Sequence, residues 1–166
     1  MKKDVLKTIL SFIAVVLWAV VIFGFSSQSG SVSSNTSGSV IRIVAEIFNP
    51  SFDKISISEQ AEIIKAWQNV VRKGAHFFEY AVLGVLLANA FYRITAGVKK
   101  WLFPIFTCLI YAVSDELHQF FVPKRSCSLK DVFLDTFGGM VGVAIFLSVA
   151  YLIKKVKQKK KQKLQI

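Results

Sequence analysis

The stretch TILSFIAVVLWAVVIFGF, from Thr8 to Phe25, decides the class of this protein. It contains no charged side chain, and a helix needs about 20 mostly apolar residues to cross the hydrocarbon core of a membrane. The run is longer than the apolar part of a secretory signal peptide, and no pair of small residues marks a cleavage site at its end. We therefore expect an uncleaved membrane-spanning helix.

Three further apolar segments follow, at 75–93, 101–122 and 132–153. Their apolar residues are continuous rather than alternating, which argues against the strands of a membrane barrel. The chain of 166 residues is 54% hydrophobic with a mean hydropathy of +0.52, which excludes intrinsic disorder. Two cysteines exclude a disulfide-rich scaffold. The sequence predicts an all-α integral membrane protein, a single domain over 1–166 with four transmembrane helices.

The positive charges orient the predicted bundle. Thirteen of the 21 basic residues lie before the first segment, from the last residue of the second segment (Arg93) to the start of the third, or in the tail 154–166, accompanied by one acidic residue, Asp4. Cytoplasmic loops carry such an excess of lysine and arginine, so we expect both termini in the cytoplasm. The net charge of +11 does not indicate nucleic acid, because the basic tail lacks interleaved aromatic residues and any folded nucleic-acid motif.

The segment 26–71 then forms an outer loop that is partly helical. Its serine-rich beginning, 26–39, is predicted to be irregular. The apolar stripe of a short helix comes next, at Val40, Val44, Ile47 and Phe48, and Pro50 limits that helix. This helix either lies flat in the outer interface or lids the bundle. Ser56 and Glu59 form a capping box that begins a helix running into the second transmembrane segment.

Ionisable residues within or beside the membrane gather at the outer end. Lys73, His76 and Tyr80 share one helix face, as do Glu116 and Gln119, and as do Asp131 and Asp135. An unpaired charge in the membrane costs at least about 2.5 kcal/mol. These side chains must therefore pair with one another or with Arg125, be protonated, or line a wet cavity.

Three kinds of chemistry fit this constellation. Lys73 and Arg125 could hold a phosphate or carboxylate group. His76 and Glu116 could act as a general acid–base pair. A divalent cation on His76, Glu79, Glu116 and Asp135 is the third, but the single His-x-x-Glu element reverses the order found in di-iron bundles. We accordingly predict neither a metal nor another cofactor.

These residues, taken in order, resemble the VanZ-like family. The family pattern of Lys-x-x-His-x-x-x-Tyr, Glu-x-x-Gln and Pro-x-Arg is matched at Lys73–Tyr80, Glu116–Gln119 and Pro123–Arg125, and Asp131 and the glycines Gly138 and Gly142 follow. One departure is Asp135, where the family usually has asparagine. The resemblance implies a multi-pass protein of the bacterial plasma membrane related to low-level resistance to teicoplanin.

The leading functional hypothesis is binding of a membrane lipid or lipid-linked envelope precursor at the outer leaflet. Its ligand-binding residues would be Lys73, Tyr80, Gln119, Arg125, Asp131 and Asp135. The alternative is an intramembrane hydrolase or transferase acting on a phospholipid or polyprenyl phosphate, with His76 and Glu116 as catalytic residues. A small transporter with Glu79 or Glu116 carrying protons ranks third. The motif Gly138-x-x-x-Gly142 could join two copies in a homo-oligomer, but packing within the bundle is favoured.

Overall fold

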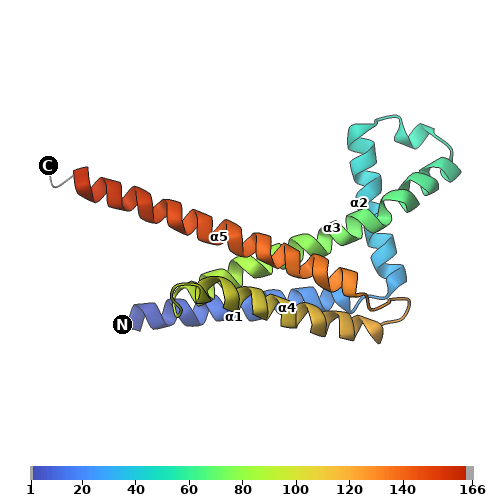
Figure 1. The fold of residues 1–166 in the computed structure, drawn as a ribbon. Coiled ribbons are helices and arrows are strands. Elements are labelled where there is room, and N and C mark those ends of the chain that lie inside the picture. The colour runs from blue at the N-terminus through green and yellow to red at the C-terminus, as the bar shows by residue number, and fades with distance from the viewer. Residues whose placement is uncertain (1, 164–166) are drawn as a thin grey trace.

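The computed structural model describes residues 2–163, which form five α-helices and one short 3-10 turn (Figure 1). The elements in chain order are α1 (Lys2–Ser26), α2 (Gly30–Phe48), η1 (Phe52–Lys54), α3 (Ile57–Tyr92), α4 (Lys99–Phe120) and α5 (Leu129–Lys163). No strand occurs in this range. The predicted all-helical fold is confirmed.

Three of these helices are long and apolar enough to cross a membrane: α1 over Asp4–Ser26, α3 over Ile57–Tyr92 and α5 over Leu129–Gln162. The third of the predicted segments corresponds to α4, which has 22 residues but does not reach the same average hydropathy. Its two adjacent acidic residues, Asp115 and Glu116, lower that average. The count of four spans therefore stays a prediction.

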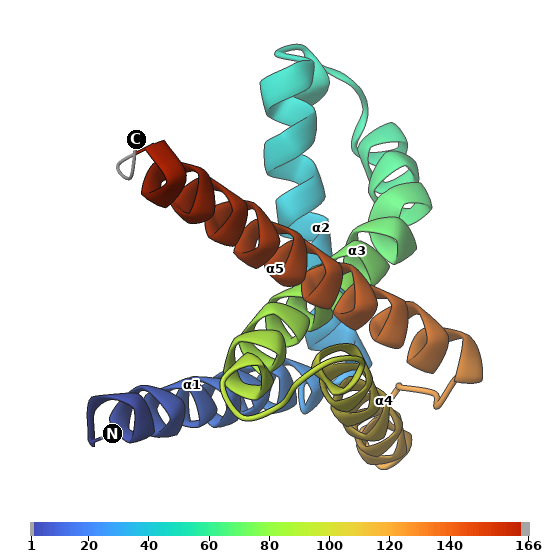
Figure 2. The same cartoon turned by 60° about the vertical axis from the view of Figure 1, so that its left-hand side comes forward.

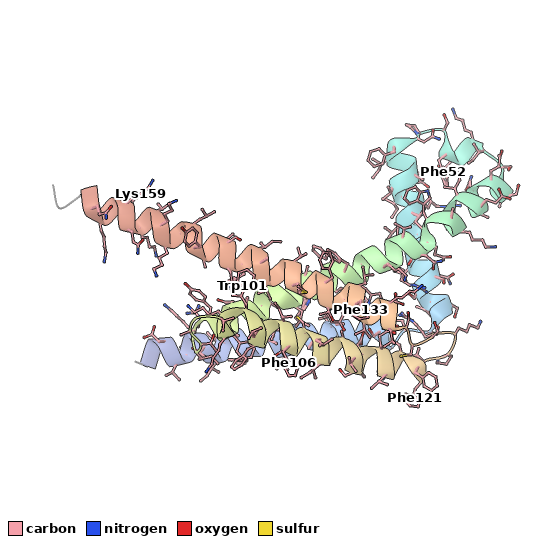
Figure 3. All side chains as sticks on the ribbon, in the orientation of Figure 1. Phe52, Trp101, Phe106, Phe121, Phe133 and Lys159 are labelled. Carbon is pink, nitrogen blue, oxygen red and sulfur yellow. The ribbon has the colours of Figure 1, made fainter. Side chains whose placement is uncertain are left out.

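The helices α1, α4, the later half of α3 and the first half of α5 lie together as a bundle (Figure 1, Figure 2). Both ends of the described chain and the α3–α4 connection lie at one end of the bundle, whereas the α1–α2 and α4–α5 connections lie at the other. We call this second end the outer end. The latter part of α5, which carries the lysine-rich tail as far as Lys161, diverges from the bundle as an exposed helix, with Lys159 near its far end (Figure 3).

Polarity in the bundle is distributed in the way a lipid environment requires. Phe106 of α4 and Phe121, the residue after it, project away from the bundle, with 62% and 80% of their surface exposed (Figure 3). Acidic side chains such as Asp115 and Asp135 are instead buried inside. The buried core is small and joins four helices through Ile22, Tyr80, Leu83, Leu87, Cys108, Ala112 and Val132.

Glycines set the distance between α3 and α5 where these helices cross. A Cβ atom on Gly84 would overlap the carbonyl oxygen of Gly139, and one on Gly142 would overlap that of Ala81. A Cβ on Gly138 would likewise meet the backbone of Phe77. Small residues allow helix backbones to approach closely in membranes. The favoured interpretation of Gly138-x-x-x-Gly142, packing within the bundle, is confirmed.

The serine-rich segment is helical, so its prediction as irregular chain was wrong. Ser29 caps α2 by accepting a hydrogen bond from the backbone of Val32, and Ser37 donates to the carbonyl of Ser33 at 2.9 Å. Thr36 and Ser39 donate in the same way to the carbonyls four residues before them, an arrangement in which the hydroxyl is satisfied within the helix. The buried face of α2 consists of small residues followed by one isoleucine: Gly30, Ser33, Ser37 and Ile41.

The helix α3 begins as predicted, with the Ser56–Glu59 capping box, and continues through Gly74 without a break. Its first half packs with α2 as a helical hairpin that extends away from the bundle, with Phe52 buried at the tip (Figure 1, Figure 3). Only the first turn of α2 contacts the α4–α5 loop, where the backbone of Gly30 donates to the carbonyl of Pro123. The apolar stripe from Val40 to Phe48 is exposed, so α2 does not lid the bundle.

Candidate functional site

A cavity of about 160 Å³ opens at the outer end of the bundle. It lies between α3, the end of α4, the α4–α5 loop and the start of α5. Its lining is mostly charged or polar: Arg72, Lys73, His76, Glu116, Gln119, Lys124, Arg125, Ser126, Asp131, Leu134 and Asp135. A water molecule takes about 30 Å³ in the liquid, so the cavity has room for several waters or for a phosphate-sized group.

Arg125 ties the α4–α5 loop to the end of α1. Its Nε donates to the carbonyl of Gln28 at 3.2 Å, its Nη2 to the carbonyl of Phe25 at 3.4 Å, and its Nη1 to Oε1 of Gln119 at 3.0 Å. A guanidinium has five N–H groups, so two remain for a ligand. Burial, followed by the nearby Arg72 guanidinium, lowers the pKa of Arg125, yet an arginine keeps its charge at neutral pH.

Two lysines lie at the rim of the cavity, and only one of them forms an ion pair in the described chain. The Nζ atom of Lys73 pairs with Oδ1 of Asp131 at 2.6 Å and so joins α3 to α5. Lys124 adopts a left-handed backbone conformation with φ of 61°. Its ammonium group forms no hydrogen bond or ion pair within residues 2–163. Lys124 is therefore the lysine available to a ligand without breaking an existing pair.

Glu116 holds the end of the α4–α5 loop next to α5. Its Oε2 accepts a hydrogen bond from the backbone nitrogen of Ser128 at 2.7 Å, at the residue that precedes α5. A carboxylate at a helix N-terminus is stabilised by the helix dipole. Both predicted catalytic residues, His76 and Glu116, line the cavity, but no hydrogen bond between them is present in the described chain.

A buried polar layer lies below the cavity. Oδ2 of Asp115 accepts hydrogen bonds from the Ser26 hydroxyl at 2.8 Å and from the Gln119 amide at 3.1 Å. Oε1 of Gln119 also accepts the hydrogen bond from Arg125. These hydrogen bonds together join the end of α1 to α4 and to the α4–α5 loop. Asp115 and Ser26 are not among the predicted site residues, although the four-residue spacing of Asp115 and Gln119 indicates that these two share a helix face.

The remaining predicted residues divide between the cavity and the core. Asp131 and Asp135 line the cavity, together with Lys73, Gln119 and Arg125. Tyr80 does not, because it is fully buried and its ring packs 6.1 Å from that of Tyr111.

Two hydrogen bonds from side chains to backbone carbonyls fix the helices that carry the site relative to one another. The indole nitrogen of Trp18 donates to the carbonyl of Glu79 at 2.9 Å, and the Tyr111 hydroxyl donates to the carbonyl of Ala19 at 2.6 Å. Both bonds reach carbonyl groups of a neighbouring helix. They tie α1 to α3 and α4 directly beneath the polar layer.

The apolar exterior, the spanning helices and the inward-facing polar site define a multi-pass helical membrane protein. The family model of VanZ/LLP1 matches residues 11–153, most of the chain, and the protein belongs to that family. The match confirms the resemblance read from the sequence and extends it to α1 and α2. No curated protein and no solved structure matches the chain significantly.

Proposed function

We propose that this protein binds the anionic head group of a membrane lipid or lipid-linked envelope precursor in the cavity at its outer end. The observation that carries the proposal is the lining of that cavity, a space large enough for a phosphate. Its basic side chains outnumber its acidic ones by four to three: Arg72, Lys73, Lys124 and Arg125 against Glu116, Asp131 and Asp135. Lys124 and two N–H groups of Arg125 would contact the ligand. Gln119 and the carbonyls of α1 fix the guanidinium in place, which reduces the entropy lost on binding.

The proposal includes a topology of four spans with both termini in the cytoplasm of a bacterial cell. The 22 residues of α4 extend over about 33 Å, which is enough to cross the hydrocarbon core. Its outward face is apolar at Phe106, Ile110 and Leu117, and its carboxylates face inward. Because α3 ends at one end of the bundle and α5 begins at the other, α4 has to cross between them (Figure 1).

Binding can be measured on the full chain purified in mild detergent, by native mass spectrometry and by titration with three probes. The probes are a polyprenyl phosphate, phosphatidylglycerol and inorganic phosphate, which separate a lipid-linked precursor, a membrane lipid and a bare anion. Losing a hydrogen bond to a charged group costs about 1.5–3 kcal/mol. We therefore expect Lys124→Ala to weaken binding by about 10–100-fold.

The matched control is Lys54→Ala, which removes a lysine from η1, far from the cavity lining. Arg125→Ala should abolish ligand binding while leaving membrane insertion intact. Arg125→Lys should recover part of the binding, because it restores the positive charge but not the planar set of N–H donors. Equal binding of all three probes by wild type and Lys124→Ala would contradict the proposal. If binding is confirmed, deletion of the gene in its host should change susceptibility to teicoplanin, as measured by growth inhibition.

A second candidate function is hydrolysis or group transfer on a phospholipid or polyprenyl phosphate. The observation in its favour is that His76 and Glu116 both face the cavity, although on different helices. This function requires turnover by the purified protein that depends on pH and is lost in His76→Ala. A wild-type protein that binds lipid but leaves a panel of envelope lipids unchanged over hours would exclude it.

A further inference from the structure

Three potential metal ligands from three helices meet beneath the cavity. His76 of α3, Asp115 of α4 and Asp135 of α5 each place one nitrogen or oxygen atom within 4.8 Å of the other two. These residues are far apart in sequence, and only the crossing of α3 and α5 together with the end of α4 brings them to one point. Glu116, considered with His76 and Asp135 on sequence grounds, turns instead toward Ser128.

Two of the three candidate ligands are buried, His76 is partly buried, and each of the three has one polar atom without a hydrogen bond. Asp115 is 3% exposed and Asp135 is 1% exposed. The Oδ1 atom of each carboxylate and the Nδ1 atom of His76 have no hydrogen-bond partner in the described chain. Within residues 2–163 no lysine or arginine nitrogen lies within 4.0 Å of either carboxylate. Two buried carboxylates are costly unless they take up protons or a cation balances their charge.

We propose that His76, Asp115 and Asp135 form a binding site for one divalent transition-metal cation, such as Zn²⁺ or Mn²⁺. An imidazole with two carboxylates is a donor set that suits these metals. The charge of the cation balances the two carboxylates. Around a metal with bonds of about 2.1 Å, neighbouring ligand atoms are about 3–3.5 Å apart, a separation that donors within 4.8 Å of one another can reach by small side-chain rotations.

Surrounding groups already hold the ligands in position. Ser26 and Gln119 both donate to Oδ2 of Asp115, which leaves Oδ1 free for a metal. Hydrogen bonds of this kind orient metal-binding carboxylates. Oε2 of Glu79 lies 3.8 Å from Nδ1 of His76 and also has no hydrogen bond, so a third acidic group lies beside the imidazole.

A cation can reach this position from the aqueous side. His76 and Asp135 belong both to the ligand set and to the lining of the cavity, whereas Asp115 lies deeper. The inference does not depend on head-group binding, because metal content is measured without any lipid. Failure of either proposal therefore leaves the other intact.

The test uses full-length protein purified in detergent, stripped with EDTA and reloaded with Zn²⁺ or Mn²⁺ separately. Metal content is measured by mass spectrometry after removal of free metal, and Mn²⁺ affinity by loss of the free-ion signal in electron paramagnetic resonance. We expect about one ion per chain in the wild type. His76→Ala and Asp135→Asn should weaken binding by at least about 100-fold, and Ser26→Ala by about 10-fold, because it removes only a supporting hydrogen bond.

The matched controls are His118→Ala, whose imidazole contacts Ser27 and the ring of Phe23 and is not one of the three candidate ligands, and Asp53→Asn in η1. Both should bind metal as the wild type does. The proposal is overturned if the reloaded wild type retains neither ion, or if His118→Ala loses metal while His76→Ala keeps it. If a ligand variant fails to fold, the wild type alone tests the proposal. About one ion per chain and a metal-dependent rise of its melting temperature would support the site, and the absence of both would overturn it.

Discussion

Replacing Gly142 by alanine tests whether the bare backbone of α5 sets its distance from α3. A Cβ atom there would overlap the carbonyl oxygen of Ala81. Since non-bonded heavy atoms prefer separations of about 3.5 Å or more, the two helices would have to move apart by about 1 Å. A gap of that size removes about a quarter to a half of the dispersion energy at each contact across the crossing.

Overpacking of this kind costs about 1–3 kcal/mol. The better helix propensity of alanine offsets about 1 kcal/mol, so we expect a net loss of about 0–2 kcal/mol in the free energy of unfolding. Gly74→Ala is the matched control, because it has the same propensity change in the interior of α3 but no heavy atom within 4 Å of the added carbon. The control should be more stable than Gly142→Ala by about 1–3 kcal/mol.

The assay is equilibrium unfolding of each variant in mixed micelles, by titration with sodium dodecyl sulfate and measurement of the tryptophan fluorescence. If Gly142→Ala and Gly74→Ala unfold at the same detergent fraction, the glycine does not set the helix separation. In that event α3 and α5 would be free to shift relative to one another, and the positions of His76 and Asp135 would not be fixed by the crossing.

Three other predictions concern orientation, the rim of the cavity and the hairpin. Cys127, which is exposed in the α4–α5 loop, should react with a membrane-impermeant maleimide on intact cells, and labelling only after permeabilisation would reverse the orientation. Lys73→Ala should cost only about 0–1 kcal/mol in the same unfolding titration, because its pair with Asp131 is partly exposed, and a much larger loss would mean that lipid desolvates the pair. In a variant with Trp18→Phe and Trp101→Phe, the fluorescence of Trp67 should be quenched most by lipids brominated near the head group, and an absence of quenching would place the hairpin in water.

Hydropathy predicted the helical class and the order of the helices, but it could not place every boundary. The run from Thr8 to Phe25 lies wholly within α1. For α2 the composition was misleading, because serine is typical of loops. The small residues Gly30, Ser33 and Ser37 nevertheless recur at helical spacing, and that pattern predicts a close-packed helix once the polarity of serine is set aside.

Much of the candidate site could be predicted because topology alone brings the ends of α3, α4 and α5 together. The pairing of individual side chains could not be predicted, because residue spacing does not give the rotation of one helix relative to its neighbours. Asp115 and Glu116 are adjacent in sequence, yet one accepts from Ser26 on α1 and the other from the backbone of Ser128. Arg125 likewise binds carbonyl oxygens of the α1 end, which no count of charges would have indicated.

The bonds from Arg125 to Phe25 and Gln28 span about a hundred residues of sequence, and this has a consequence for how the protein is made. While the ribosome is still translating α4, the carbonyls at the end of α1 have no arginine to accept from. If α4 spans the membrane as proposed, the acidic groups of α3 and α4 enter the lipid before α5 exists to enclose them. Insertion of this chain is therefore completed late, and a product truncated before Arg125 would expose unsatisfied carboxylates to the proteases that remove unassembled membrane proteins.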